Sequence, residues 1–344
     1  MKKIGFLFSV VISLTIFESY SQTLIAVQNG GTTSFYQQVD DAILNSQDGD
    51  TIYIPGGTWS LSRLINKRLH IVGVGYHPDS TNATFPTKLM GHLFLAAGSS
   101  EGSCTGLFLD GAIYDDYDPV ELYKIERCYI SGGVQVNQQN SQFTFIENYI
   151  SGNIYCGSGS ASHFSFFNSV IAAFTLNSRP FTNSVFRNNI FLSASSCDWG
   201  NCHYVIACSF SLFENNIFYN TWQYNALLAA VSNSIFKNNL FVDNNPFPNG
   251  SLNVGSNNLI SQAQNCIIVN YTGIHYSSDY HLQPTCPGKN AGTDGTDIGI
   301  YGGVYPWKDG GVPFNPHIQH IVTSPQTDSS GNLNVDIKVA AQDR

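Results

Sequence analysis

Three hexapeptides, FRNNIF (186–191), FENNIF (213–218) and FKNNLF (236–241), carry the pattern that decides the fold of this chain. Each opens with an aromatic or aliphatic residue, has a small polar residue three places later, and returns to a large apolar residue two places after that. Four more segments fit the same pattern: IERCYI (125–130), FIENYI (145–150), FFNSVI (166–171) and AQNCII (263–268). Successive small polar positions are separated by 20 to 27 residues, a period that is typical of solenoids.

Each repeat is predicted to be one coil of short strands. The repeats are rich in Phe, Ile, Val and Asn, and they show no sustained apolar recurrence at helical spacing. Equivalent residues of successive coils would stack about 4.8 Å apart. Asn suits a bend because it tolerates left-handed backbone and its amide can bond backbone groups or the next Asn. We therefore predict an all-β, right-handed parallel β-helix with a structural ladder of Cys128, Asn148, Ser169, Asn189, Asn216, Asn239 and Cys266. An apolar core column would run beside it through Ile130, Ile150, Ile171, Phe191, Phe218, Phe241 and Ile268.

Both ends of such a stack expose strand edges and need a cover. Residues 35–44 place Val39, Ala42 and Ile43 on one side at helical spacing, which predicts a short amphipathic capping helix. Residues 318–323 and 333–340 are apolar-polar runs joined by TDSSGN (327–332), which predicts a terminal hairpin. The predicted organisation is a signal peptide at 1–21, a β-helix domain with its caps at 22–317, and a hairpin or tail at 318–344.

The first 21 residues predict export. Lys2 and Lys3 precede the apolar run 4–17, and small residues follow at Ser19 and Ser21. No later segment approaches the roughly 20 apolar residues of a spanning helix, so we expect a secreted or cell-surface protein without a membrane span. The net charge of −9 argues against nucleic acid as a partner.

Eight cysteines in an oxidising compartment permit disulfides, although their pairing cannot be read from the sequence. Cys197 and Cys202 are close enough to clip one loop, and a disulfide there is as consistent with the sequence as two free thiols. Cys128 and Cys266 lie at the repeated position and are expected to be buried thiols.

A resemblance to a known superfamily adds to this prediction. The helix at 35–44, DGDTIYIPGGTW (48–59) and LHIVGVG (69–75) resemble the opening coils of the pectate-lyase-like β-helix superfamily. With the repeats, the resemblance covers about residues 24 to 275. Residues 278–303, SDYHLQPTCPGKNAGTDGTDIGIYGG, resemble the C-terminal end of right-handed β-helix repeat proteins exported by Bacteroidetes-like bacteria. The family is defined by its fold, so the resemblance implies a β-helix and little about catalysis.

An acidic segment gives the best candidate for chemistry. β-Helix polysaccharide lyases commonly place a carboxylate-bound cation beside an Arg or Lys that removes a proton from a uronate. The acidic residues here are followed by Lys124 and Arg127, and comprise Asp110, Asp115, Asp116, Asp118 and Glu121. Oxygen ligands suit Ca²⁺, so Asp115, Asp116 and Asp118 form a candidate calcium site. The alternative is a solvated loop between coils.

Other charged residues are predicted to be structural. Arg187, Glu214 and Lys237 occupy the same place in three successive repeats, and Arg127 and Glu147 share a column in two others. Stacking these positions pairs opposite charges on neighbouring strands. Asp294 and Asp297 lie in a Gly-rich setting, GTDGTDIG, that predicts turns.

Aromatic residues in the irregular intervals are the best candidates for binding. Trp199, Trp222 and Tyr224 lie where the spacing departs from the tight coil pattern, and inserted loops commonly carry recognition in solenoids. Trp59 is a further candidate, and core packing is the alternative for each ring. No catalytic set is identified. The sequence therefore favours an exported binding or adhesive module facing polysaccharide or a cell-surface protein, with a polysaccharide lyase or glycoside hydrolase acting on acidic glycans as the alternative.

Overall fold

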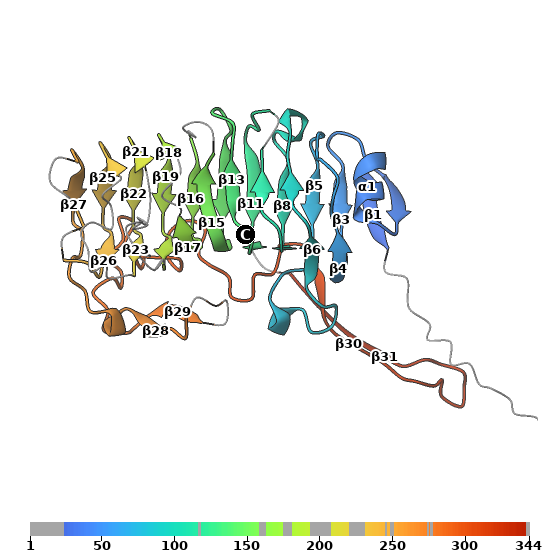
Figure 1. Ribbon diagram of the computed structural model, residues 1–344. Helices are drawn as coiled ribbons and strands as arrows, with labels where there is room; N and C mark the ends of the chain where they lie inside the picture. The colour runs from blue at the N-terminus through green and yellow to red at the C-terminus, as the bar shows by residue number, and fades with distance from the viewer. Residues whose placement is uncertain are drawn as a thin grey trace, which may run out of the picture.

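The protein is an all-β parallel solenoid of about eight turns (Figure 1). The computed structural model describes residues 24–115, 118–157, 163–174, 181–192, 208–219, 231–244, 246–247, 251–273, 275 and 278–341. The predicted fold class is confirmed, since successive repeats pair in register as parallel strands. None of the helices within these ranges is long and apolar enough to cross a membrane.

Two long sheets run along the solenoid. The first contains, in spatial order, β2 (Thr32–Tyr36), β1 (Ile25–Asn29), β3 (Thr51–Tyr53), β5 (His70–Val72), β8 (Ser103–Thr105), β11 (Tyr123–Glu126), β14 (Phe143–Ile146), β16 (Ser165–Phe167), β19 (Val185–Arg187), β22 (Leu212–Glu214), β25 (Ile235–Lys237) and β27 (Val254–Ser256). The second runs through β26 (Leu240–Phe241), β23 (Ile217–Phe218), β20 (Ile190–Phe191), β17 (Val170–Phe174), β15 (Tyr149–Cys156), β12 (Tyr129–Ile130), β9 (Phe108–Leu109), β6 (Thr87–Met90) and β4 (Gly57–Ser60), with β7 (Leu93–Phe94), β10 (Ile113–Tyr114) and β13 (Val134–Val136) beside it.

Shorter elements complete the described chain. A third sheet consists of β18 (Phe181–Thr182), β21 (Cys208–Ser209) and β24 (Val231–Ser232). Two antiparallel pairs follow the coils, β28 (Ile268–Asn270) with β29 (Asp279–Leu282) and β30 (His317–Thr323) with β31 (Val335–Ala340). The second pair is the predicted terminal hairpin, and it projects away from the coils (Figure 1). Single 3₁₀ turns are η1 (Pro78–Ser80), η2 (Ala97–Ser99) and η3 (Gln264–Cys266).

Stacked phenylalanines fill the core. The opening aromatic of each repeat lies over that of the next, with ring centroids 4.5 to 5.1 Å apart and ring planes within 4° of parallel, through Phe145, Phe166, Phe186, Phe213 and Phe236. The predicted apolar column is in register from Ile130 to Phe241. Its last predicted member, Ile268, instead lies in β28, which pairs antiparallel with β29.

The structural ladder runs beside this core. The backbone N–H of each ladder residue donates to the side chain of the next, as Asn189 does to Asn216 Oδ1 at 2.9 Å and Asn216 does to Asn239 Oδ1 at 2.9 Å. The column contains Cys128, Asn148, Ser169, Asn189, Asn216 and Asn239, all fully buried.

The seventh ladder position needs a correction. Asn258 accepts from the backbone N–H of Asn239 at 2.9 Å, so it takes the place predicted for Cys266. Cys266 is exposed in the turn η3. The segment AQNCII repeats the letters of the pattern but follows the last coil. The true seventh segment, GSNNLI (255–260), opens with Gly255 where the other coils have a large apolar residue.

A second polar ladder occupies another corner and was not predicted. The hydroxyls of Ser184, Ser211 and Ser234 accept from the backbone N–H of the preceding coil at 3.0 to 3.2 Å, and Asn253 continues the column. The signal was available, because NSVF, FSLF and NSIF place Ser two residues before each core Phe.

The N-terminal cap is shorter than predicted. Helix α1 spans Val39–Asn45, and its Val39, Ala42 and Ile43 face the core as expected. Phe35 belongs to β2 and is 62% exposed. The Lys67 ammonium donates to the carbonyls of residues 43, 44 and 46 at 2.7 to 3.0 Å, which satisfies the C-terminal end of the helix.

The described cysteines, Cys104, Cys128, Cys156, Cys208, Cys266 and Cys286, are free thiols. Cys128 is buried as predicted, whereas Cys266 is exposed. The predicted Cys197–Cys202 clip and the predicted signal peptide lie outside the described residues.

Candidate functional site

A segment after β29 turns back and runs along the coils (Figure 1). We call residues 283–316 the return strap. It contacts one residue of each successive coil, at the position immediately before the ladder. These residues have left-handed backbone with φ of 46 to 59°, and we call them the corner column: Arg127, Glu147, Asn168, Asn188, Asn215 and Asn238. Asn is favoured there because its short polar side chain tolerates this conformation.

The asparagines of the corner column hold the strap coil by coil. Each amide nitrogen donates to the strap, from Asn238 to the carbonyl of residue 291 at 2.8 Å, from Asn188 to that of residue 299 at 3.2 Å, and from Asn168 to those of residues 300 and 302 at 2.7 Å. Asn215 donates to Thr293 Oγ1 at 3.1 Å and accepts from the Thr293 N–H at 2.9 Å. Almost no space separates strap and coil, since a Cβ at position 299 would lie 2.5 Å from Ile217.

A buried ion pair holds the far end of the strap. Arg127 and Glu147 are 0% and 4% exposed, and two N–H groups of Arg127 bond the Glu147 carboxylate at 3.0 and 3.3 Å. Arg127 also donates to the carbonyl of Val312 at 2.8 Å, and its guanidinium lies 4.0 Å from the ring centroid of Phe314. Glu147 accepts from the N–H of Lys308 at 3.2 Å. The predicted column is therefore present, and it positions the strap as well as joining two coils.

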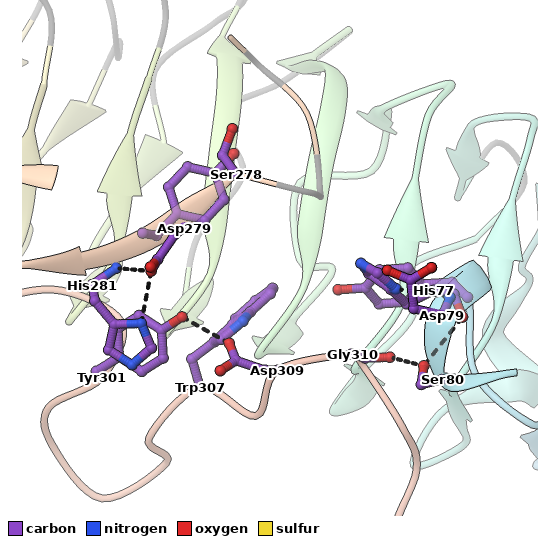
Figure 2. A pocket seen from close by; sticks show the side chains of 12 residues that line it. His77, Asp79, Ser80, Ser278, Asp279, His281, Tyr301, Trp307, Asp309 and Gly310 are labelled. Carbon is purple, nitrogen blue, oxygen red and sulfur yellow. Dashed lines mark hydrogen bonds and ion pairs between the residues drawn. The ribbon is translucent and has the colours of Figure 1, made fainter. Parts of the chain in front are cut away.

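The strap closes one side of a cleft of about 490 Å³. Three segments line it: the loop around η1, which is distant in sequence from the other two, strand β29, and the part of the strap from Tyr301 to Gly310. Figure 2 shows Asp279, His281 and Tyr301 on one side, His77, Asp79 and Ser80 on the other, and Trp307 and Asp309 between them. The remaining lining residues are Tyr76, Ser278, Tyr280 and Gly310.

Internal hydrogen bonds fix the polar groups of the cleft. The Nδ1 atom of His281 lies 2.7 Å from Asp279 Oδ1, and the His281 ring stacks on Tyr301 with centroids 3.7 Å apart. The Tyr301 hydroxyl donates to Asp309 at 2.7 Å. On the opposite side, Ser80 Oγ donates to the carbonyl of residue 310 at 2.6 Å. The carboxylates of Asp279 and Asp309 are thus oriented before any ligand arrives.

The floor of the cleft includes a tyrosine hydroxyl with an open bonding position. Tyr76 is 2% exposed and lines the cleft, and none of the described residues bonds its hydroxyl. Burial raises the pKa of Tyr76 far above its usual value, so the hydroxyl stays protonated. A Cβ at Gly311 of the strap would overlap the Tyr76 ring, so the strap needs glycine to close over it.

The charge of the cleft is negative. Its lining contains three carboxylates, Asp79, Asp279 and Asp309, and the described lining residues include no Lys or Arg. Burial acts to raise the pKa of Asp279, but the bonds from the backbone and ring of His281 outweigh it and lower the pKa. Burial raises the pKa of Tyr280 to about 12. The cleft therefore suits neutral or cationic ligands better than uronates.

The two described residues of the predicted calcium site, Asp115 and Asp118, lie in different environments. Asp115 is 1% exposed, and its carboxylate accepts from the N–H groups of Asn137 and Gln138. Burial raises the pKa of Asp115 to about 6, although those bonds and one from Ser141 act in the opposite direction. Asp118 is exposed, and Asp116 lies outside the described residues. Within the described part of the chain no group of three His, Cys, Asp or Glu could hold a metal. The calcium site stays a prediction.

The predicted binding aromatics Trp199, Trp222 and Tyr224 also lie outside the described residues. Trp59 is half-buried against the core and donates its indole N–H to the carbonyl of Pro55 at 3.0 Å. Asp294 and Asp297 bond nearby groups of the strap, as expected for turn residues.

The sequence-based prediction missed the cleft. Residues 278–303 were predicted only as the C-terminal end of the β-helix, so His281, Tyr301, Trp307 and Asp309 were assigned no role in a site. No protein-family model matches the chain, and no curated protein sequence matches it at a significant level.

Proposed function

We propose that the protein binds carbohydrate in the cleft between the η1 loop, β29 and the return strap, as an exported or cell-surface binding module. One observation carries the proposal: aromatic rings and oriented polar groups converge there from three segments. Trp307 and Tyr301 are half-exposed, and an aromatic face can stack on the apolar face of a sugar ring. Carboxylates and tyrosine hydroxyls around such rings are the few placed polar groups that fix a ligand's orientation.

The buried contacts of the strap support a preformed site. Asp309 lies within the stretch that Arg127 and Glu147 hold, and Trp307 is next to it, so the cleft does not depend on a ligand to assemble. A preformed site loses little conformational entropy on binding. The location at the cell exterior rests on the signal-like residues 1–21 and is part of the same proposal.

A glycoside hydrolase is the second candidate, because carboxylates line both sides of the cleft. Glycosidases use two carboxylates that flank the scissile bond. Asp79 stands on one side and Asp279 on the other, with Asp309 between them (Figure 2). A uronate lyase has less support, since the described cleft lining has no Lys or Arg to hold the carboxylate of an acidic glycan.

A glycan array followed by calorimetry tests the proposal. Wild type should bind a subset of glycans, and Trp307→Ala should weaken that binding at least tenfold. Tyr305→Ala is the matched control, because Tyr305 lies on the same strap, is 41% exposed and does not line the cleft. Binding to no glycan, or equal loss in both variants, would contradict the proposal. Release of reducing ends by wild type but not by Asp79→Asn would favour the hydrolase.

A further inference from the structure

We infer that the sugar bound in the cleft carries a protonated amine, so that the ligand is an amino-sugar polymer with free amino groups. This inference rests on the proposed carbohydrate-binding function and adds the chemical class of the ligand. The charge of the cleft, the unpartnered tyrosine hydroxyl in its floor and its aromatic wall point to this ligand independently.

Charge is the first argument. The groups that face the cleft are His77 and Asp79 from the η1 loop, Asp279 and His281 from β29, and Tyr301 and Asp309 from the strap. The set contains three carboxylates, one of which lies 2.7 Å from the His281 ring, and the described lining residues include no Lys or Arg. An ammonium group would form charge-assisted hydrogen bonds to these carboxylates, whereas a uronate would be repelled.

The floor of the cleft is the second argument. Tyr76 is almost fully buried, yet none of the described residues satisfies its hydroxyl. The hydroxyl opens to the cleft, so a ligand atom can bond it in place of solvent. A neutral hydroxyl can accept from an ammonium N–H and can also bond a sugar hydroxyl.

The aromatic wall is the third argument. Trp307 and Tyr301 stand beside the carboxylates of Asp309 and Asp279 (Figure 2). Trp and Tyr faces attract cations through the ring quadrupole, and they also stack on sugar rings. An amino sugar combines both features in one residue. A basic peptide offers the charge but not the pyranose face, so we commit to the sugar.

Calorimetry with two oligomers of the same backbone tests the inference. The probes are a β-1,4-linked glucosamine tetramer and its fully N-acetylated counterpart, which differ only in whether the amine can carry a charge. At a pH where the amine is protonated, the glucosamine tetramer should bind at least tenfold tighter. The preference should fall at high salt, because exposed charges are screened, and it should vanish as the amine loses its proton.

Matched variants assign the effect to the cleft. Asp79→Asn should weaken binding of the glucosamine tetramer about fivefold, the effect of one partly exposed charge pair. It should weaken binding of the N-acetylated tetramer by less, because that ligand has no ammonium to pair with the lost carboxylate. Asp41→Asn makes the same change of net charge on an exposed residue of α1 and should alter neither affinity.

Each outcome separates the inference from the proposed function. Equal or tighter binding of the N-acetylated tetramer, lost in Trp307→Ala, overturns the inference and leaves the carbohydrate function standing. Tight binding of trigalacturonate overturns it in the same way. Binding of tetralysine as tight as that of the glucosamine tetramer overturns the commitment to a sugar. Failure of both tetramers and of every glycan on the array overturns the inference and the proposed function together.

Discussion

Replacing Arg127 by methionine tests how the fold supports the cleft. Methionine retains much of the apolar length of the side chain but removes every hydrogen-bond donor. The variant loses the two bonds to Glu147 at 3.0 and 3.3 Å and the bond to Val312 at 2.8 Å. It leaves a carboxylate that is 4% exposed without its cation. Breaking a buried ion pair by removing one partner costs about 3–5 kcal/mol of unfolding free energy.

A double variant distinguishes an uncompensated charge from lost packing. Arg127→Met with Glu147→Gln removes both charges and keeps an oxygen that can accept from the Lys308 N–H. The double variant should recover about 1–3 kcal/mol relative to Arg127→Met, because no charge remains buried. Urea denaturation followed by intrinsic fluorescence gives both values. A double variant no more stable than the single one would refute the reasoning.

The pH dependence supplies a second check on the same pair. Burial raises the pKa of Glu147, while Arg127 lowers it, so removing Arg127 raises it further. A carboxyl whose pKa is raised in the folded state is stabilising when protonated, and its contribution is lost as the pH rises through that folded-state pKa. The cost of Arg127→Met should therefore be smaller near about pH 5 than near about pH 8. Equal costs at the two pH values would contradict a buried, ionised Glu147.

Three further variants address the coils. Asn216→Leu should cost about 2–5 kcal/mol in urea denaturation, because a buried N–H and a buried carbonyl lose their partners. The control Asn270→Ala, at an exposed position of β28, should change stability by less than about 0.5 kcal/mol. Ser211→Ala should cost about 1 kcal/mol by the same measurement, since one backbone N–H loses its acceptor. The pKa of Asp115 is raised to about 6 in the folded state, so the wild type loses stability as the pH rises from the pKa of the unfolded state through 6. Asp115→Asn should abolish this pH-dependent loss of about 2–3 kcal/mol of unfolding free energy, measured by thermal melts over the same pH range. If the variant keeps the pH profile of the wild type, Asp115 is not its cause.

The coil stack could be predicted because every coil of a solenoid needs the same kinds of residue at the same positions. Equivalent positions of successive coils lie against one another. The recurrence of asparagine at positions 189, 216 and 239 therefore reveals a structural requirement within a single sequence. The prediction was wrong at Cys266, where the letters matched but the chain had already left the stack. A sequence pattern identifies a coil reliably only where coils precede and follow it. Asn258 was missed because Gly255 stands where the other coils have an aromatic or aliphatic residue.

The cleft could not be predicted in the same way, because its contacts are neither periodic nor local. Asn168 and the carbonyl of residue 302 are separated by 134 positions, and nothing in the strap repeats with the coils. Its chemistry comes from Asp, His and Tyr residues that are ordinary individually. The sequence does show a doublet, and only its second member, such as Asn216, was assigned a structural role, whereas the first, Asn215, was assigned none.

That doublet explains how fold and site share one repeat. The second asparagine turns inward and satisfies backbone groups of the neighbouring coils, as Asn216 does for Asn189 and Phe186. The first adopts left-handed backbone, which directs its amide to the strap, as Asn215 does towards Thr293. In two coils the first asparagine of the doublet is replaced by Arg127 or Glu147. These charged side chains, in place of the amides, bind the end of the strap that carries Trp307 and Asp309. The strongest strap contacts therefore lie next to the proposed site, where an error in position would cost most in binding.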